Sequence, residues 1–151
     1  MKFLDSIKEG VAKAEAADRH IKEVAILFRE LNEELASFES GGVKLARKIS
    51  VQSQIAEIGA AFSESGVEKE FLSADRLALT DTEGKKNFSE VAKWRQHING
   101  FPCILSFEGQ EYICSTLDDL KAALLELLSS VGFGKALHDA LKNVKNRQKN
   151  N

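Results

Sequence analysis

The sequence contains little of what several functional classes require. Among its 151 residues are one proline, two cysteines, one methionine, one tryptophan and one tyrosine. Two cysteines are too few for the disulfide framework of a small secreted domain. No stretch approaches the roughly 20 apolar residues of a membrane-spanning helix, and charges interrupt the apolar run that a signal peptide needs. We therefore expect a cytoplasmic protein with reduced thiols.

An excess of charge of one sign is also missing. The 21 basic and 23 acidic side chains leave a net charge of −2, whereas general nucleic-acid binding usually needs a basic face. Hydrophobic residues make up 43% of the chain, which is enough to form the core of one domain. Neither nucleic acid nor membrane is therefore an expected partner.

The sequence shows no catalytic or metal-binding motif. The three histidines, His20, His97 and His138, have no second ligand at the spacing of a metal site. Residues 132–135 (Gly-Phe-Gly-Lys) lack the spacing of a phosphate-binding loop. We therefore expect a non-enzymatic protein that needs no metal or cofactor.

Asp81 offers one catalytic alternative. It follows a predicted strand, with Glu83 two residues on, and this arrangement resembles the aspartate loop of haloacid-dehalogenase-type phosphatases. The resemblance implies Mg²⁺-dependent phosphoryl transfer. Glu83 departs from the family pattern, and little parallel α/β structure follows it, so a solvated acidic turn is the interpretation we prefer.

The most extensive pattern in the sequence is a long amphipathic helix at the N-terminus. Residues 3–38 contain no proline and one glycine, and apolar side chains recur at every third or fourth position. These are Leu4, Ile7, Val11, Ala14, Ile21, Val24, Ala25, Phe28, Leu31, Leu35 and Phe38. An unbroken helix of this length measures about 55 Å, which is long for a compact domain of this size.

Three arrangements would accommodate this helix. It can lie over the sheet of its own domain, pair with another chain, or remain disordered. A bend is expected at residues 18–20 (Asp-Arg-His), which interrupt the apolar stripe. The heptad-like spacing also predicts self-association, with Asn32 as a residue that sets the register.

Shorter elements alternate in the middle of the chain. Gly41-Gly42 ends the first helix. The predicted elements are a strand over residues 43–51, a short helix from Ser53, a loop over 63–66, a strand over 76–80 and a helix over 89–98. This alternation predicts a mixed sheet with parallel pairing in its first part.

Residues 99–115 read as a hairpin. Two apolar runs flank Glu108-Gly109, as in a hairpin with a primed two-residue turn. This register places Cys103 opposite Cys114, at a separation that permits a disulfide. A turn shifted by one residue, to Gly109-Gln110, would instead place the two cysteines on opposite faces. Ser115 or Thr116 then caps an apolar helix that we expect to end at Gly132.

Residues 100–107 (Gly-Phe-Pro-Cys-Ile-Leu-Ser-Phe), with the turn, strand and helix after them, resemble the C-terminal half of thioredoxin-like proteins. In that family a proline, usually cis, precedes an antiparallel hairpin and a closing helix. The resemblance implies a thioredoxin-like core. The position that would carry the family's Cys-x-x-Cys motif reads Ser50-Val51-Gln52-Ser53, so the resemblance implies a core without the redox centre.

Together these patterns predict an α+β fold. It consists of a long N-terminal amphipathic helix, a thioredoxin-like mixed sheet with helices, and a C-terminal antiparallel hairpin. The expected parts are the helix over residues 1–40, the α+β domain over 41–132, and a C-terminal helix with a basic tail over 133–151.

The favoured function is binding to another protein, as an inhibitor, adaptor or assembly factor of bacterial or phage origin. One predicted contact surface is the helix face around Leu31, Leu35 and Phe38, which would fill a groove of the partner. The other comprises Trp94, Arg95 and His97, because Trp and Arg are frequent in binding hot spots. Alternatively, Trp94 belongs to the core.

A second function remains open from the sequence. Cys103 and Cys114 could serve a thiol-dependent redox enzyme or sensor, provided that a nearby cation or helix end lowers a thiol pKa. Both lie inside apolar strands, where free cysteines usually pack as small hydrophobic side chains.

Overall fold

The computed structural model describes residues 2–61 and 70–149 of the chain. Their elements are α1 (Phe3–Ala36), β1 (Val43–Lys48), α2 (Val51–Ala61), β2 (Arg76–Asp81), β3 (Asn87–Gln96), β4 (Cys103–Phe107), β5 (Gln110–Cys114), α3 (Leu117–Leu128) and α4 (Val131–Lys149). The predicted α+β class is confirmed. The predicted loop over residues 63–66 lies outside the described residues.

The five described strands form an antiparallel meander in the order β1-β2-β3-β4-β5. The expected mixed sheet with parallel pairing is therefore wrong. Short connections link β2 to β3, β3 to β4 and β4 to β5, and a short connection can only join antiparallel neighbours. The thioredoxin-like relationship stays a prediction that rests on residues 100–131.

The predicted helix over residues 89–98 is also wrong, because this segment forms the central strand β3. Its backbone pairs with β2 on one side and with β4 on the other. Along the strand, Ala92, Trp94 and Gln96 are buried while Lys93 and Arg95 are exposed. Local apolar spacing allowed a helix here, but two neighbouring strands satisfy the backbone of this segment on both sides.

The hairpin of β4 and β5 matches the prediction in its register. Cys103 lies opposite Cys114, and both Glu108 and Gly109 have positive φ, 50° and 76°, as a primed turn requires. The Phe101–Pro102 peptide bond before it is cis.

The expected helix start after the hairpin is confirmed, and the expected helix end is not. Thr116 caps α3 by accepting a hydrogen bond from the Asp119 N–H at 3.1 Å. The helix stops at Leu128 rather than at Gly132, which belongs to the first turn of α4. There the Gly132 N–H donates to Glu108 Oε1 at 2.9 Å, so a carboxylate of the hairpin turn satisfies a free N–H at the start of α4.

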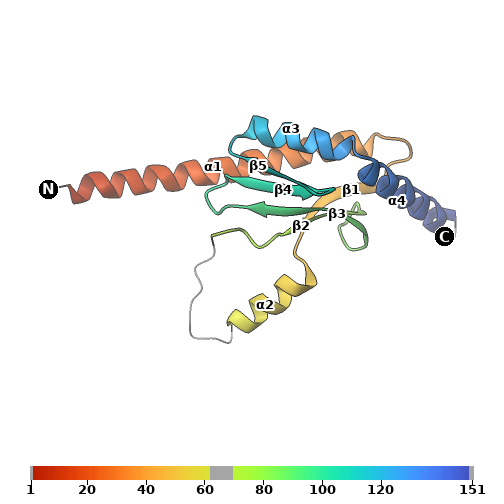
Figure 1. Cartoon of the computed structure of the whole chain (residues 1–151), viewed down its shortest axis with the longest axis horizontal. Coiled ribbons are helices and arrows are strands. Elements are labelled where there is room, and N and C mark those ends of the chain that lie inside the picture. The colour runs from red at the N-terminus through yellow and green to blue at the C-terminus, as the bar shows by residue number, and fades with distance from the viewer. Residues whose placement is uncertain (1, 62–69, 150–151) are drawn as a thin grey trace.

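Three helices cover one face of the sheet, and α2 lies on the other side (Figure 1). α1 packs along β1, α3 over β4 and β5, and α4 across β1, β2 and β3. The core between these layers includes Val24 and Phe28 from α1 and Phe133 and Leu141 from α4. The three expected parts of the chain thus contribute to one hydrophobic core.

α1 is an unbroken helix of 34 residues, about 51 Å long. The expected bend at residues 18–20 is absent from this helix. The N-terminal half of α1 extends beyond the sheet, and its C-terminal half lies over it (Figure 1). The helix meets the domain at His20, whose ring centroid lies 5.4 Å from that of Phe101.

Asn32 fixes α1 to the edge of the sheet. Its side-chain amide donates to the Leu45 carbonyl at 2.9 Å and accepts from the Leu45 N–H at 2.8 Å. β1 is an edge strand, so the outward backbone groups of Leu45 face no neighbouring strand. Asn32 therefore completes the sheet edge, which such edges need, instead of setting the register between two chains.

Candidate functional site

An apolar groove lies where the C-terminal end of α1 approaches the junction of α3 and α4. It has a volume of about 510 Å³, within the range of ligand-binding pockets. Its apolar lining comes from all three helices and from the turn after α1, and consists of Leu31, Leu35, Phe38, Leu128, Phe133, Leu137 and Leu141. We call this feature the terminal groove.

The floor of the terminal groove is buried and its rim is exposed. Phe133 and Leu141 are 4% and 5% exposed and belong to the core, whereas Phe38 is 48% exposed. Glu34, Glu39 and His138 also line the groove. An apolar trough with two carboxylates at its margin suits an apolar segment that carries basic side chains.

The structure brings together one of the two predicted contact sets. Leu31, Leu35 and Phe38 line the terminal groove, and α4 supplies part of the opposite wall. These three side chains therefore shape a hollow in this chain. That they contact a partner by filling its groove stays a prediction.

The second predicted set is divided between the two faces of the sheet. Trp94 is 1% exposed and lies edge-to-face against Phe28, with ring centroids 5.3 Å apart, so it is part of the core. Arg95 points to the opposite face, where its guanidinium carbon lies 4.0 Å from the centre of the Phe71 ring. The His97 ring meets the same Phe71 at 5.6 Å.

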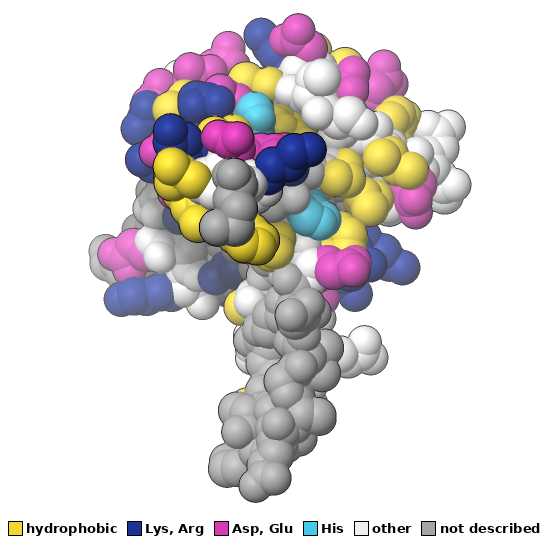
Figure 2. All heavy atoms as spheres, turned by 90° about the vertical axis from the view of Figure 1, so that its left-hand side faces the viewer, with side chains coloured by type: hydrophobic (Ala, Val, Ile, Leu, Met, Phe, Trp, Pro, Cys, Tyr) yellow, Lys and Arg dark blue, Asp and Glu magenta, His cyan; other side chains and the backbone are white. Residues whose placement is uncertain are grey.

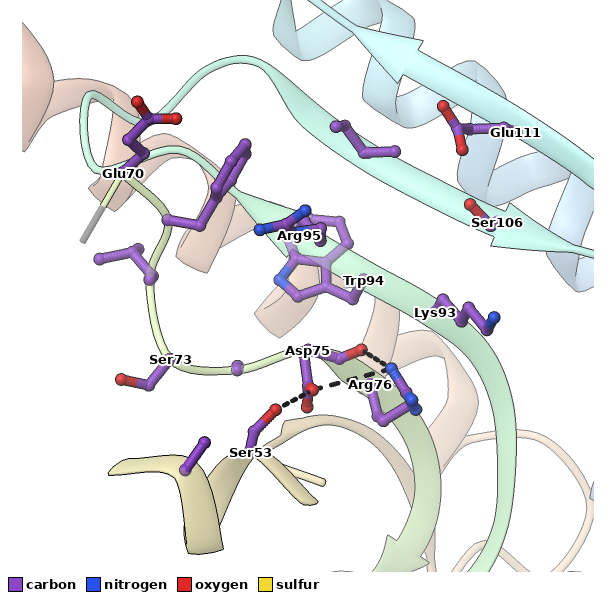
Figure 3. A pocket seen from close by; sticks show the side chains of 15 residues that line it. Ser53, Glu70, Ser73, Asp75, Arg76, Lys93, Trp94, Arg95, Ser106 and Glu111 are labelled. Carbon is purple, nitrogen blue, oxygen red and sulfur yellow. Dashed lines mark hydrogen bonds and ion pairs between the residues drawn. The ribbon is translucent and has the colours of Figure 1, made fainter. Parts of the chain in front are cut away.

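Arg95 belongs to a larger polar pocket of about 920 Å³ between the sheet and residues 70–76 (Figure 3). Three basic and three acidic side chains line it: Arg76, Lys93, Arg95, Glu70, Asp75 and Glu111. The balance of signs gives no preference for a ligand of either charge. One of the acidic groups, Asp75, already pairs with a basic neighbour, since Arg76 lies 3.8 Å from it.

Asp75 has a structural role at the start of α2. Its carboxylate accepts hydrogen bonds from the Ser50 N–H at 2.6 Å, the Ser50 hydroxyl at 2.8 Å and the Ser53 hydroxyl at 2.5 Å. Burial raises the pKa of Asp75, but these hydrogen bonds and Arg76 outweigh it and hold the pKa below its usual value. The Ser50 hydroxyl oxygen accepts from the Ser53 N–H at 3.2 Å, so Ser50 caps α2 and Asp75 holds this cap in place. Figure 3 shows the contact between Asp75 and Ser53.

Both cysteines are free thiols buried in the sheet. Burial, followed by the neighbouring Cys114, raises the pKa of Cys103 to about 12 although Arg47 opposes the shift. Burial and Asp119 raise the pKa of Cys114 to about 11. At neutral pH both groups are therefore protonated, and a protonated thiol is a poor nucleophile.

Asp81 is the last residue of β2, and its carboxylate and backbone bond to the turn that follows. Its carboxylate accepts from the Lys85 N–H at 2.9 Å and lies 4.0 Å from Arg147. Burial raises the pKa of Asp81, and hydrogen bonds from the backbone of Lys85 and its neighbours, with Arg147, lower it below the usual value. These contacts fit the solvated acidic turn that the sequence favoured.

A third surface lies on the N-terminal half of α1, where Phe3, Leu4, Ile7 and Val11 are 73, 60, 62 and 54% exposed. We call these four side chains the projecting stripe. Figure 2, viewed from the side of the N-terminus, shows hydrophobic, basic and acidic side chains close together around this end of the helix.

Three further properties bear on these sites: membrane-spanning helices, clusters of metal-ligating side chains, and similarity to known proteins. Among the described residues, none of the helices has both the length and the apolar character to cross a bilayer, and no cluster of three metal-ligating side chains occurs. In comparisons with known proteins, the chain matches no family model, no curated protein and no solved structure.

Sequence reasoning missed the α4 side of the terminal groove and the partner of Arg95. Phe133, Leu137 and Leu141 were recognisable as the apolar face of the last helix, but the pattern did not say which helix they meet. Phe71 had no signal of its own, because its contact with Arg95 and His97 depends on β3 being a strand.

Proposed function

We propose that the protein acts by binding another protein, and that the terminal groove accepts an amphipathic helix of this partner. The observation that carries the proposal is an apolar hollow with a buried floor and an exposed aromatic rim. Helices commonly dock in this way, with apolar residues three or four positions apart entering a hydrophobic groove.

The chemistry of the groove defines the partner segment further. Phe38 is large, aromatic and half exposed, as are many residues that anchor an interface. Glu34 and Glu39 favour a partner helix with Lys or Arg beside its apolar face. The proposed partner thus offers an amphipathic helix with a basic margin.

Such binding fits an inhibitor, adaptor or assembly factor. The proposal needs no catalytic group, metal or cofactor from this chain. It also retains the expectation of a cytoplasmic protein of bacterial or phage origin. The two buried free thiols are compatible with the cytoplasmic part of this expectation.

The test is a comparison of capture by variants of the full-length tagged protein. Phe38→Glu places a charge in the groove, and we expect it to reduce capture of a specific protein at least tenfold. Ile55→Glu, at a position 65% exposed on α2, introduces the same charge outside the groove and should leave capture unchanged. Cross-linking should place a helix of the captured protein against residues 31–38. Equal capture by wild type and Phe38→Glu would contradict the proposal.

The redox alternative is favoured by one observation, the position of Cys103 directly opposite Cys114. Oxidation of this pair would join two strands that are already neighbours. The raised pKa values of both thiols weigh against it. Rapid alkylation of either thiol in the folded protein would return this alternative to first place.

A further inference from the structure

The projecting stripe is an apolar surface that the described part of the molecule does not cover. All four of its side chains are more than half exposed, and α1 packs on the domain from about His20 onward. Contiguous exposed apolar side chains rimmed by charges mark an interaction site. This surface lies at the opposite end of α1 from the terminal groove (Figure 1).

The projecting stripe points in a different direction from the buried face of the same helix. At 3.6 residues per turn, its mean direction lies about a quarter turn from that of Val24 and Phe28, the buried residues of α1. A second helix can therefore lie along the projecting stripe beside the domain, outside the space that the sheet and α3 fill.

The charges around the projecting stripe select its occupant. Residues 2–19 hold four basic and four acidic side chains, which are Lys2, Lys8, Lys13, Arg19, Asp5, Glu9, Glu15 and Asp18. A balanced set has no net attraction for an anionic membrane or for nucleic acid. It can, however, pair with a copy of itself without net repulsion.

Two of these charges favour antiparallel pairing. Lys8 and Glu15 lie two helical turns apart on the same edge of the stripe. When Val11 of one chain lies level with Ala14 of the other, Lys8 of each chain comes beside Glu15 of the other. A parallel pair would instead set Asp18 against Asp18, and like charges at facing positions are destabilising.

The overlap is large enough for a specific contact. The same alignment sets Leu4 level with Ile21, so the contact spans residues 4–21, about 27 Å of helix. The facing sides of two helices of this length bury on the order of 1,000 Å² in total, the lower limit for a specific interface. The contact then ends where α1 joins the domain at His20.

We propose that two copies of the chain pair in antiparallel orientation through residues 4–21 of α1. The pairing needs neither the terminal groove nor its partner, so each can fail without the other. In this dimer the two domains lie at opposite ends of the paired helices, and both terminal grooves remain open.

The first test is the mass of the full-length protein in solution, measured by sedimentation at several concentrations up to about 100 µM, a range suited to a micromolar dissociation constant. We expect a dimer that dissociates on dilution. Ile7→Glu should raise the dissociation constant at least tenfold, whereas Ile55→Glu, at a similarly exposed isoleucine, should leave it unchanged. A monomer at every concentration, or a dimer that Ile7→Glu leaves intact, would overturn the proposal. Loss of the dimer in Phe38→Glu would also overturn it, because the groove would then be the contact.

The second test concerns orientation. Lys8→Glu and Glu15→Lys each place like charges across an antiparallel pair, so each variant alone should dimerise more weakly than wild type. A mixture of the two variants restores opposite charges at both contacts and should form a heterodimer several-fold more stable than either homodimer. Absence of this preference in a protein that still dimerises would overturn the antiparallel arrangement.

Discussion

The two halves of α1 have the same periodicity and opposite environments. In residues 20–36, Val24 and Phe28 are 0% and 4% exposed and Asn32 bonds to the sheet edge. In residues 3–19, Ile7 and Val11 are 62% and 54% exposed. Both halves are continuous helix. An apolar stripe therefore indicates which side of a helix becomes buried, but it does not indicate which element or partner buries that side.

The difference between the halves has a local cause. Among the described residues, only the second half lies beside an edge strand, the turn at Gly100 and α3, and its end shares the terminal groove with α4. The first half extends past them (Figure 1). Substitutions in the two halves test whether side chains that differ in exposure also differ in their contribution to the free energy of unfolding.

The largest contrast is expected between Phe28 and Ile7. Phe28→Ala leaves a cavity against Trp94 and uncovers Arg47, whose guanidinium carbon lies 4.8 Å from the Phe28 ring centre. We expect it to lower the free energy of unfolding by about 3–5 kcal/mol. Ile7→Ala, measured by denaturant unfolding of the dilute protein, should change it by less than about 0.5 kcal/mol. Similar losses in both variants would show that the first half also packs on the domain.

The next contrast uses two glycines. A Cβ added at Gly100 would come 2.4 Å from His20 Cβ, and the φ of this residue is +94°. Gly100→Ala should therefore destabilise the protein by about 2–3 kcal/mol. Gly10 lies in the projecting half, where an added Cβ meets no described atom within 4 Å. Gly10→Ala should stabilise the helix by about 0.5–1 kcal/mol. Thermal unfolding distinguishes these signs, and destabilisation by both would contradict the account.

A smaller effect is expected at Asn32. Asn32→Ala removes both hydrogen bonds to Leu45 and leaves the backbone of an edge strand without its partner. We expect a loss of about 1–2 kcal/mol in denaturant unfolding. Asn143→Ala is the matched control, because Asn143 donates to the Asp139 carbonyl of its own helix at 3.1 Å, at an exposed position. An equal loss in the control would remove the special role of Asn32.

These predictions follow from contacts that the sequence foretold only in part. The helix, the hairpin register and a cap at Ser115 or Thr116 were predictable because each depends on neighbours within a few residues. The strand β3 was not predictable. Val91, Trp94 and Ile98 fit a helical spacing, whereas the strand forms because its backbone pairs with β2 and β4.

The candidate site was predictable to a similar extent. Leu31, Leu35 and Phe38 were identified from their spacing, whereas the groove they line exists only because α4 returns to the end of α1. Trp94 and Arg95 were grouped together as neighbours in sequence. In a strand, adjacent side chains point to opposite faces, and one of them became core.

The last contrast concerns the reactivity of thiols rather than the stability of the fold. Cys103 lies beneath the junction of α1 with the domain and donates to the Gly100 carbonyl at 3.3 Å. With pKa values of about 12 and about 11, Cys103 and Cys114 should alkylate slowly, and their rates should still rise above pH 9. A thiol introduced by Ser6→Cys should react at least about 100-fold faster at neutral pH and level off near pH 9. Equal rates would show that the buried thiols are accessible.

Hydrogen exchange along α1 of the full-length protein, at two concentrations, tests the two-part character of this helix most directly. In dilute protein, amides of residues 21–36 should exchange as slowly as those of the core strands, and those of residues 3–18 should exchange fast. Raising the concentration should slow exchange in residues 3–18 alone. Equal protection of both halves in dilute protein, or exchange in residues 3–18 that does not respond to concentration, would contradict the account.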